Sequence, residues 1–406
     1  MSRSLPLFFC FGLIWTGILA GCNRQSATNN QNASADARQS AIQVITPLSD
    51  TLTTPALNPH LASAIQDSFR QAMNRYRIDP ENNTYFLNLA TATTATGDFR
   101  EALSLYGEGV FKFPEDPRVF LGRSIVWMQL RELQNAQNDI QLALERAEDS
   151  TQLMDFHAGT DPDSRIFREI LHHMAFLSLM QGQYDDAAAR LGQASDLRRD
   201  ASQEIQKGRE SALDGEVALE EMVASEEEGV SEAKGASDDI AIPGAFAEAF
   251  WTMIAHQRSG DLDAADQILR ESQKHPTYGS GPDSWGSMQE QNATEAIRST
   301  PSNVEPLWMS NPAFSGQHTD VYAALFSLFA GDAEPDLLLN HFWPASQTTF
   351  ELLHHGLAYW HLHNGRETQA IQSWESILDT PETPFGHLYL LAESNITNSI
   401  NPQQGL

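Results

Sequence analysis

Apolar and small side chains recur at helical spacing along most of this chain, and short polar turns interrupt them at regular intervals. In the first clear unit, Phe86, Leu89 and Ala90 fall on one side of a helix, because residues three and four positions apart share a face. Gly97 follows where a turn is expected, and Tyr106 belongs to a second apolar stretch. The pattern therefore predicts two antiparallel helices joined by a glycine-containing turn.

The same unit repeats along the chain. Pro80 and Glu81 recur thirty-four residues later as Pro114 and Glu115. A fixed internal period of this length indicates a repeat architecture, in which each unit buries its apolar face by stacking on its neighbours. One copy carries Arg131 in place of the turn glycine. The remaining copies have their turns at Gly182, Gly260, Gly331 and Gly365.

These hairpins resemble the tetratricopeptide repeat (TPR), in which a large residue, a leucine and a small residue precede the turn glycine, and an alanine, an aromatic residue and a proline follow it. Ala90 and Ala102 stand where the helices of the first copy cross, since small residues allow a close crossing. The resemblance implies an all-α fold, an α-solenoid of TPR-like helical hairpins. A non-repeat all-α domain is the alternative, and it would belong to the same fold class.

Two stretches of different composition separate groups of hairpins. Residues 201–240 are rich in Glu, Asp, Ser and Gly, which predicts an acidic linker whose first half can continue as a solvated helix. The linker is interpreted as a spacer, with docking of a basic partner as the alternative. The segment at about 276–319 is rich in Gly, Ser, Pro and Asn, and we expect it to pack as an insertion over one face.

The chain is therefore expected to form two TPR-like blocks separated by the acidic linker. The N-terminal block covers residues 57–200, and the C-terminal block covers 241–400 and includes the insertion. The sequence leaves open whether the two blocks form one superhelix.

The first residues have the pattern of a secretory signal peptide, 1–21, in which Arg3 precedes an apolar run too short to span a membrane safely. The run ends in Leu-Ala-Gly before Cys22, which resembles the lipobox of bacterial lipoproteins. That family acylates the cysteine thiol and cuts the bond before it, so the resemblance implies lipidation of Cys22 and a membrane anchor. Residues 22–56 hold few large apolar side chains and predict a disordered tether. An uncleaved signal anchor is the alternative.

Asn23 follows the cysteine that this resemblance marks for lipidation. In lipoproteins of Gram-negative bacteria an aspartate at this position favours retention in the inner membrane. The protein is therefore expected on the periplasmic face of the cell envelope, with the outer membrane favoured over the inner membrane.

The chain has a formal net charge of −29 and two cysteines, Cys10 and Cys22. A surface of this charge repels nucleic acid and anionic lipid, so we expect no nucleic-acid partner and attachment to the membrane through lipid alone. Only Cys22 remains once the signal peptide is removed, which leaves no disulfide, no cysteine metal site and no catalytic thiol.

The sequence carries no motif for catalysis or cofactor binding. It lacks Gly-x-Ser-x-Gly, the phosphate-binding Gly-x-x-x-x-Gly-Lys and Gly-x-Gly-x-x-Gly. His354, His355, His361 and His363 cluster, but no acidic residue lies among them and no His-Glu-x-x-His spacing occurs. We therefore expect no enzymatic activity, no cofactor and no metal site.

The first helix of each TPR hairpin lines a concave surface that binds ligands in that family. Carried onto this chain, the resemblance implies a partner-binding groove at apolar, aromatic and histidine positions, and we select Met128, Phe176, Met180, Phe250, His355 and Tyr359. Such a groove fits an extended or helical apolar segment. The alternative is that these side chains pack against neighbouring copies or the insertion.

Together these features predict a membrane-anchored TPR-like lipoprotein that acts as a protein–protein interaction adaptor in the bacterial cell envelope. Its partner would be an unidentified envelope protein or peptide, and a homo-oligomer through the segment 385–391 is conceivable. The alternative function is an envelope protein that binds a small molecule or metal through a His-containing groove.

Overall fold

The computed structural model describes residues 42–45, 51–53, 59–153, 162–223, 245–274, 318–343, 345–379 and 386–400. The signal peptide and Cys22 lie outside these residues, as do most of the predicted tether and nearly all of the predicted insertion. The chain divides into two units at Ile42, and all described helices belong to the second, Gln43–Leu406.

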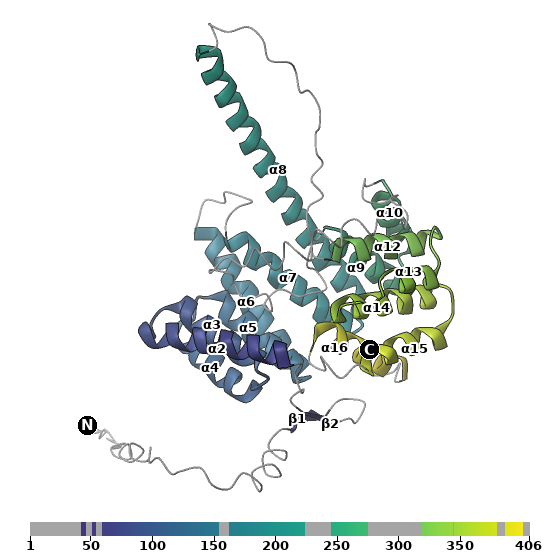
Figure 1. Ribbon diagram of the computed structural model, residues 1–406, viewed down its shortest axis with the longest axis horizontal. Helices are drawn as coiled ribbons and strands as arrows, with labels where there is room; N and C mark the ends of the chain where they lie inside the picture. The colour runs from purple at the N-terminus through teal and green to yellow at the C-terminus, as the bar shows by residue number, and fades with distance from the viewer. Residues whose placement is uncertain are drawn as a thin grey trace, which may run out of the picture. The chain divides into compact units, whose positions relative to one another are not determined.

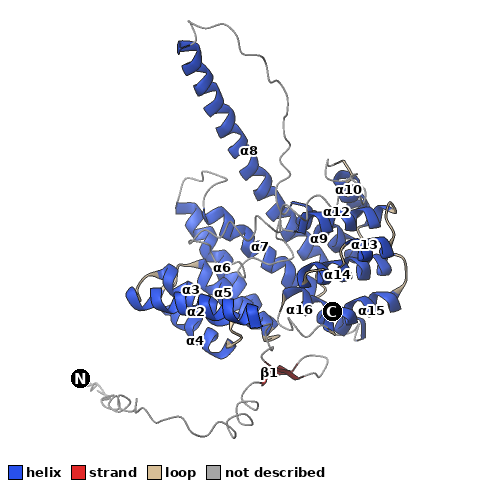
Figure 2. Ribbon diagram, viewed as in Figure 1, coloured by secondary structure: helices blue, strands red, loops and turns tan. Residues whose placement is uncertain are grey.

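Helices make up nearly all of the described chain (Figure 2). Five consecutive pairs pack as hairpins within the described ranges: α3 (Asn83–Ala95) with α4 (Phe99–Lys112), α5 (Pro117–Gln129) with α6 (Leu133–Leu153), α7 (Pro162–Met180) with α8 (Tyr184–Val223), α9 (Ala245–Ser259) with α10 (Leu262–Ser272), and α14 (Gln347–His363) with α15 (Glu367–Leu378). Helices α12 (Thr319–Ala330) and α13 (Pro335–His341) follow each other across a turn, and both pack on α14. The prediction of an all-α solenoid of TPR-like helical hairpins is confirmed.

Four further elements flank the hairpins (Figure 1). Helix α2 (Pro59–Ile78) precedes them and α16 (His387–Ile400) follows them. The short strands β1 (Ile42–Ile45) and β2 (Thr51–Thr53) form a two-stranded sheet.

The predicted turn positions adopt the left-handed backbone conformation. Their φ angles lie between 69° and 90° at Gly97, Gly182, Gly260, Gly331 and Gly365. A side chain is strained in this conformation, so glycine there ends one helix and reverses the chain at little cost.

An aspartate after the turn starts the next helix in two of the hairpins. The side chain of Asp98 accepts a hydrogen bond from the backbone N–H of Glu101, and that of Asp261 accepts one from Ala264, both at 3.2 Å. Each carboxylate thereby satisfies one of the free donors at the helix N-terminus. In these hairpins glycine ends the first helix and the following aspartate starts the second, so the two residues together specify the turn.

Small residues allow helices of neighbouring hairpins to approach closely. A Cβ atom at Gly122 of α5 would overlap the ring of Tyr106 on α4, and one at Gly356 of α14 would overlap Leu325 on α12. Ala90 and Ala102, the predicted crossing residues of the first hairpin, are both fully buried in one cluster. Close crossing at small residues is the packing that the repeat pattern predicts.

One apolar cluster runs from Phe120 to Ile396 and takes in residues of both predicted blocks. Two smaller clusters lie among α2, α3, α4 and α5. Helix α8 continues to Val223, into the first half of the predicted acidic linker, and it packs on α9. Across the described ranges, no helix combines the length and the apolar character needed to cross a membrane.

Candidate functional site: the inner helices and α16

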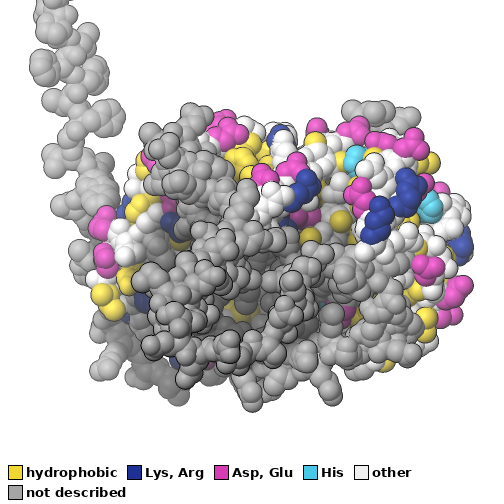
Figure 3. Space-filling model, turned by 90° about the horizontal axis from the view of Figure 1, so that it is seen from above, with side chains coloured by type: hydrophobic (Ala, Val, Ile, Leu, Met, Phe, Trp, Pro, Cys, Tyr) yellow, Lys and Arg dark blue, Asp and Glu magenta, His cyan; other side chains and the backbone are white. Residues whose placement is uncertain are grey.

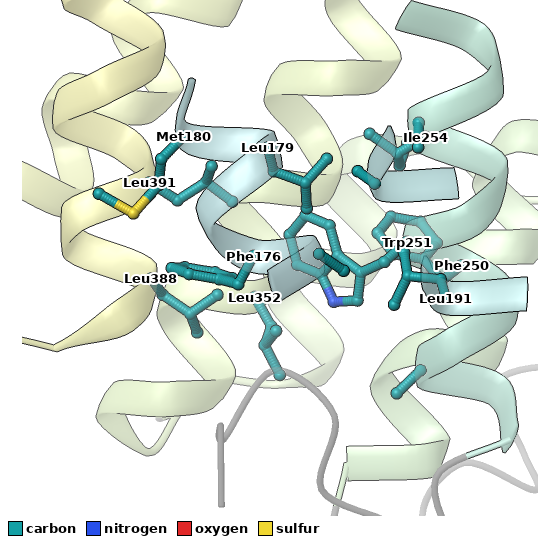
Figure 4. Close-up of a cluster of buried hydrophobic side chains, with 14 of the residues drawn as sticks. Phe176, Leu179, Met180, Leu191, Phe250, Trp251, Ile254, Leu352, Leu388 and Leu391 are labelled. Atoms are coloured by element: carbon teal, nitrogen blue, oxygen red, sulfur yellow. The ribbon is translucent and has the colours of Figure 1, made fainter. Parts of the chain in front are cut away.

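The last described helix, α16, lies beside α7 and α14 (Figure 1). Both of these are first helices of their hairpins, the class of helix for which the TPR resemblance predicts a ligand-binding surface. Figure 4 shows Leu388 and Leu391 of α16 next to Phe176 and Met180 of α7. The chain's own C-terminal helix therefore occupies the position predicted for a ligand.

The six predicted partner-binding residues are all buried in the large core cluster. Their exposed fractions are between 0% and 3% for Met128, Phe176, Met180, Phe250, His355 and Tyr359. The expectation that they line an open groove is corrected, because packed side chains of neighbouring helices already cover them. The structure instead gives them the packing role that the sequence left as the alternative.

Four of the six predicted residues contact α16 directly. The ring of His387 lies 5.4 Å from that of Phe176, and Asn398 Nδ2 donates to the carbonyl of Met180 at 3.3 Å. Asn395 Nδ2 donates to the hydroxyl of Tyr359 at 2.9 Å, and His355 Nε2 lies 2.8 Å from the Leu388 carbonyl. These four side chains therefore pack against α16 of the same chain.

The remaining two predicted residues, Phe250 and Met128, pack against other parts of the described chain. Phe250 lies among aromatic rings, 5.6 Å from Trp251, 5.5 Å from Tyr322 and 5.8 Å from Phe326. Met128 is fully buried on α5 in the same large cluster. These two positions hold neighbouring hairpins together.

Both ring nitrogens of His355 are engaged. The indole N–H of Trp374 donates to Nδ1 at 3.2 Å, so Nε2 carries the hydrogen that is donated to Leu388. Burial lowers the pKa of His355 to about 4, which keeps this imidazole neutral at physiological pH. A metal could reach His355 only if these hydrogen bonds broke.

A pair of buried imidazoles joins α7 to α16. The rings of His173 and His387 lie 5.3 Å apart. Burial, together with the proximity of His173, lowers the pKa of His387 to about 3, and burial also lowers the pKa of His173. The contact between α7 and α16 therefore favours the neutral form of both histidines.

Arg131 stands at the one hairpin turn where glycine is missing, and its φ of 62° is the sole positive value at a non-glycine position in the described chain. Its guanidinium Nε donates to Glu393 Oε2 of α16 at 2.8 Å, and its Nη1 donates to the carbonyl of Gln129 at 2.6 Å. The two charged side chains are 7% and 4% exposed. A buried ion pair therefore ties the second hairpin to the C-terminal helix.

A further buried charge cluster joins α7, α8 and α9. Glu248 is fully buried, and its carboxylate accepts hydrogen bonds from Arg198 Nη2 at 2.6 Å and Nε at 3.0 Å. His172 Nε2 lies 2.7 Å from the same carboxylate. Burial raises the pKa of Glu248, but the bonds from His172 and Arg198 outweigh burial and leave it lowered. This cluster connects the helices on either side of the acidic linker.

Sequence reasoning did not identify Glu393, Asn395 or Glu248 as residues that hold helices together. A polar residue on a helix gives no sign of its partner when that partner lies far along the chain. Arg131 was the available signal, because an arginine at a turn position that favours glycine requires a compensating contact.

The segment 385–391, considered for homodimerisation, does not offer a surface where the structure describes it. Leu388, Leu390 and Leu391 are at most 1% exposed, because they pack against α7 and α14 within the chain. That expectation is corrected. Among the described residues, no group of three or more His, Cys, Asp or Glu side chains is arranged to hold a metal ion.

The sequence matches no family model, and no curated protein is significantly similar to it. It is similar to the solved TPR domain of P58(IPK), with 14% identity over 84% of this chain and 96% of that chain, at a TM-score of 0.20. It is also similar to yeast Tom70, with 12% identity over 84% and 96% of the two chains, at 0.18. A chain in the structure of Naa15/Naa10 bound to HypK shows 12% identity over 85% and 63%, at 0.24. TM-scores this low do not define a common fold, so the architecture rests on the hairpins of this chain.

Proposed function

We propose that this protein is a membrane-anchored TPR-like lipoprotein that acts as a protein–protein interaction adaptor in the bacterial cell envelope. The observation that carries the proposal is the face on α7 and α14 that holds α16, since helix-in-groove contact is a common mode of protein recognition. The partner would be an envelope protein that presents an amphipathic helix. A catalytic role is not part of the proposal.

The chemistry of α16 describes the helix that this face accepts. Leu388 and Leu391 supply an apolar face toward α7, Asn395 reaches the hydroxyl of Tyr359, and Glu393 reaches Arg131. A partner helix with two apolar residues one turn apart, followed by an acidic residue, meets the same requirements. Such a helix binds in exchange for α16.

The proposed anchor is the lipid on Cys22, which lies outside the described residues. The lipobox-like sequence before it supports lipidation, and Asn23 supports the periplasmic face of the outer membrane over the inner membrane. We expect the wild-type protein in the outer-membrane fraction and Cys22→Ala in the soluble periplasmic fraction or as uncleaved precursor. Equal membrane association of both forms, with the signal peptide removed from the Cys22→Ala variant, would exclude a lipid anchor.

The adaptor role is tested by crosslinking in living cells followed by affinity recovery of the full-length protein. Asn395→Ala combined with Asn398→Ala removes two hydrogen bonds that α16 donates to α14 and α7, which favours release of α16. We expect this variant to recover more of one envelope protein than the wild type does. The matched control is Asn364→Ala, because Asn364 is exposed and its side chain bonds only within α14, to the Trp360 carbonyl.

Faster amide exchange in α16 would show that the asparagine double variant releases this helix. If recovery of the envelope protein is then unchanged or lower, the proposal that a partner helix replaces α16 at this face is overturned. No specific partner with any form would overturn the adaptor role itself. The alternative of a metal or small molecule bound through a His-containing groove gains no support, since both ring nitrogens of His355 are engaged by Trp374 and Leu388.

A further inference from the structure

A pocket of about 240 Å³ lies between α13 and the beginning of α14, away from the face that α16 covers. Its lining is mainly apolar and aromatic and includes Leu339, Phe342, Trp343, Phe350, Leu353 and His354. None of these side chains belongs to the predicted partner-binding set.

Trp343 forms part of the rim and is 73% exposed. A tryptophan is the largest apolar side chain, and leaving it in water is unfavourable unless a ligand covers it. Tryptophan is also among the residues that most often dominate binding energy at protein interfaces. The exposure of Trp343 beside a pocket therefore indicates a contact surface.

One of the residues that line the pocket is His354. His354 is stacked against Phe350, with ring centroids 4.1 Å apart, and its Nδ1 is buried without a hydrogen-bond partner. Burial lowers the pKa of His354, which favours the neutral ring.

The size of the pocket restricts the class of ligand. Sites for small molecules usually have volumes of about 300–1,000 Å³, so a pocket of about 240 Å³ is small for a cofactor or drug-sized compound. It has the size of a single large side chain. A side chain that enters such a pocket acts as the anchor of a wider protein contact.

The charge of this part of the chain indicates the sign of the partner. The described residues between 318 and 400 include nine acidic side chains, of which Glu351 and Glu393 are buried, and one basic side chain, Arg366. Glu334 and Asp336 lie at the beginning of α13, the helix that leads into the pocket. On the face drawn in Figure 3, acidic side chains are spread around the described surface. A basic segment would be attracted to this region and an acidic segment repelled.

We propose that the pocket beside Trp343 is a docking site for an aromatic side chain carried on a basic segment of a partner protein. This inference rests on the proposed adaptor function, because it supplies a second contact for the same protein partner. The aromatic side chain enters between Phe342 and Phe350, while Trp343 covers its exposed edge. The flanking lysines or arginines of the partner meet the acidic surface around the pocket.

The test uses calorimetry on the full-length protein in detergent with three peptide probes. The probes are acetyl-Lys-Lys-Phe-Lys-Lys-amide, the same peptide with alanine in place of phenylalanine, and the same peptide with glutamate in place of every lysine. We expect binding of the first peptide only, and we expect Trp343→Ala to weaken it by at least about tenfold. The matched control is Phe111→Ala on α4, since Phe111 is 89% exposed but lies far along the chain from the pocket.

Equal binding of the phenylalanine and alanine peptides would overturn the aromatic anchor, and equal binding of the acidic peptide would overturn the charge argument. A Trp343→Ala variant that binds as the wild type does, while its circular dichroism is unchanged, would overturn the pocket. If Trp343→Ala instead dissolves a dimer in sedimentation, or loses binding to phosphatidylcholine vesicles, the occupant is a second copy or a lipid and the proposal fails.

A photo-crosslinking residue in place of Trp343 separates this proposal from the adaptor function. Capture of the protein recovered in the α16-exchange experiment supports both. If that protein is recovered but never crosslinks at position 343, the pocket assignment fails and the adaptor stands. If the basic aromatic peptide binds but no envelope protein is ever recovered, the adaptor fails and the pocket stands.

Discussion

The first helices of the array and its last helices are built from the same kind of hairpin but are held together differently. Helices α2 to α4 pack on their sequence neighbours around two small apolar clusters. In the second half, α16 returns to α7 and α14, and Glu393 bonds to Arg131 262 residues away. The first region is a linear stack, whereas the second is closed by its final helix.

This difference predicts where the chain unfolds as a unit. In a linear repeat array each copy is stabilised only by its neighbours, so local opening at one end leaves the remainder intact. A helix that contacts distant copies makes their unfolding interdependent. The closing contacts should therefore be the sites where single substitutions have long-range effects.

The largest expected effect comes from breaking the buried ion pair. Glu393→Ala leaves a buried guanidinium without its carboxylate and should lower the free energy of unfolding by about 3–5 kcal/mol in denaturant titrations. Arg131→Gly combined with Glu393→Ala should restore most of this loss, since glycine suits the positive φ at position 131. The exposed Glu375→Ala on α15 serves as control, and a loss below about 1 kcal/mol for Glu393→Ala would mean that the pair does not hold α16.

Truncating the apolar contact of α16 should be the next largest change. Leu391→Ala removes a fully buried side chain beside Phe176 and Met180, at a cost of about 3 kcal/mol. Amide exchange should rise in α7 and α14 as well as in α16. The matched substitution in the linear region, Leu87→Ala, should raise exchange only in α3 to α5, and an equally wide spread from both would remove the distinction between the regions.

Acidification should weaken the closed region selectively. Burial holds the pKa of His355 at about 4 and that of His387 at about 3 in the folded state, and it also lowers that of His173. The unfolded chain takes up protons first as pH falls below about 6.5, so stability is present above that value and is lost toward the folded pKa values.

His355 and His387 should together cost about 1.4 kcal/mol between pH 7 and pH 6. Urea titrations at a series of pH values measure this slope, and His355→Gln should reduce it. Stability that is constant from pH 7.5 to pH 5.5 would contradict neutral burial of these rings.

The smallest expected effect belongs to the linear region. The hydroxyl groups of Thr91 and Tyr106 are 3.0 Å apart and buried, and burial raises the pKa of Tyr106 to about 12. Thr91→Val removes this hydrogen bond and should cost about 1 kcal/mol. The increase in amide exchange should stay within α3 and α4; an increase that reaches α16 would show that the first region is also coupled to the closure.

The hairpins themselves could be predicted from the sequence. The turn glycines, exemplified by Gly97 and Gly365, and the aspartates that follow some of them act through bonds within a few residues, so their pattern is visible locally. The candidate site was predicted only in part. Phe176 and Tyr359 were assigned to a surface for a partner, but in the structure they pack against α16 of the same chain.

An open groove and a filled groove have the same sequence pattern, because both require apolar side chains on one helical face. The pattern at Phe176, Met180 and Tyr359 therefore could not distinguish them. The pocket beside Trp343 was also beyond prediction, since it depends on how α13 ends against the first turn of α14.

The sequence by itself determined the helices, their turns and their order, because backbone hydrogen bonds, caps and left-handed glycines act over a few residues. It also carried the one irregular turn, Arg131. Only the tertiary structure decided that α16 folds back on α7 and α14 and that Arg131 meets Glu393. The path of the stacked hairpins brings these groups together, and that path is the sum of many small crossing angles rather than a property of any short segment.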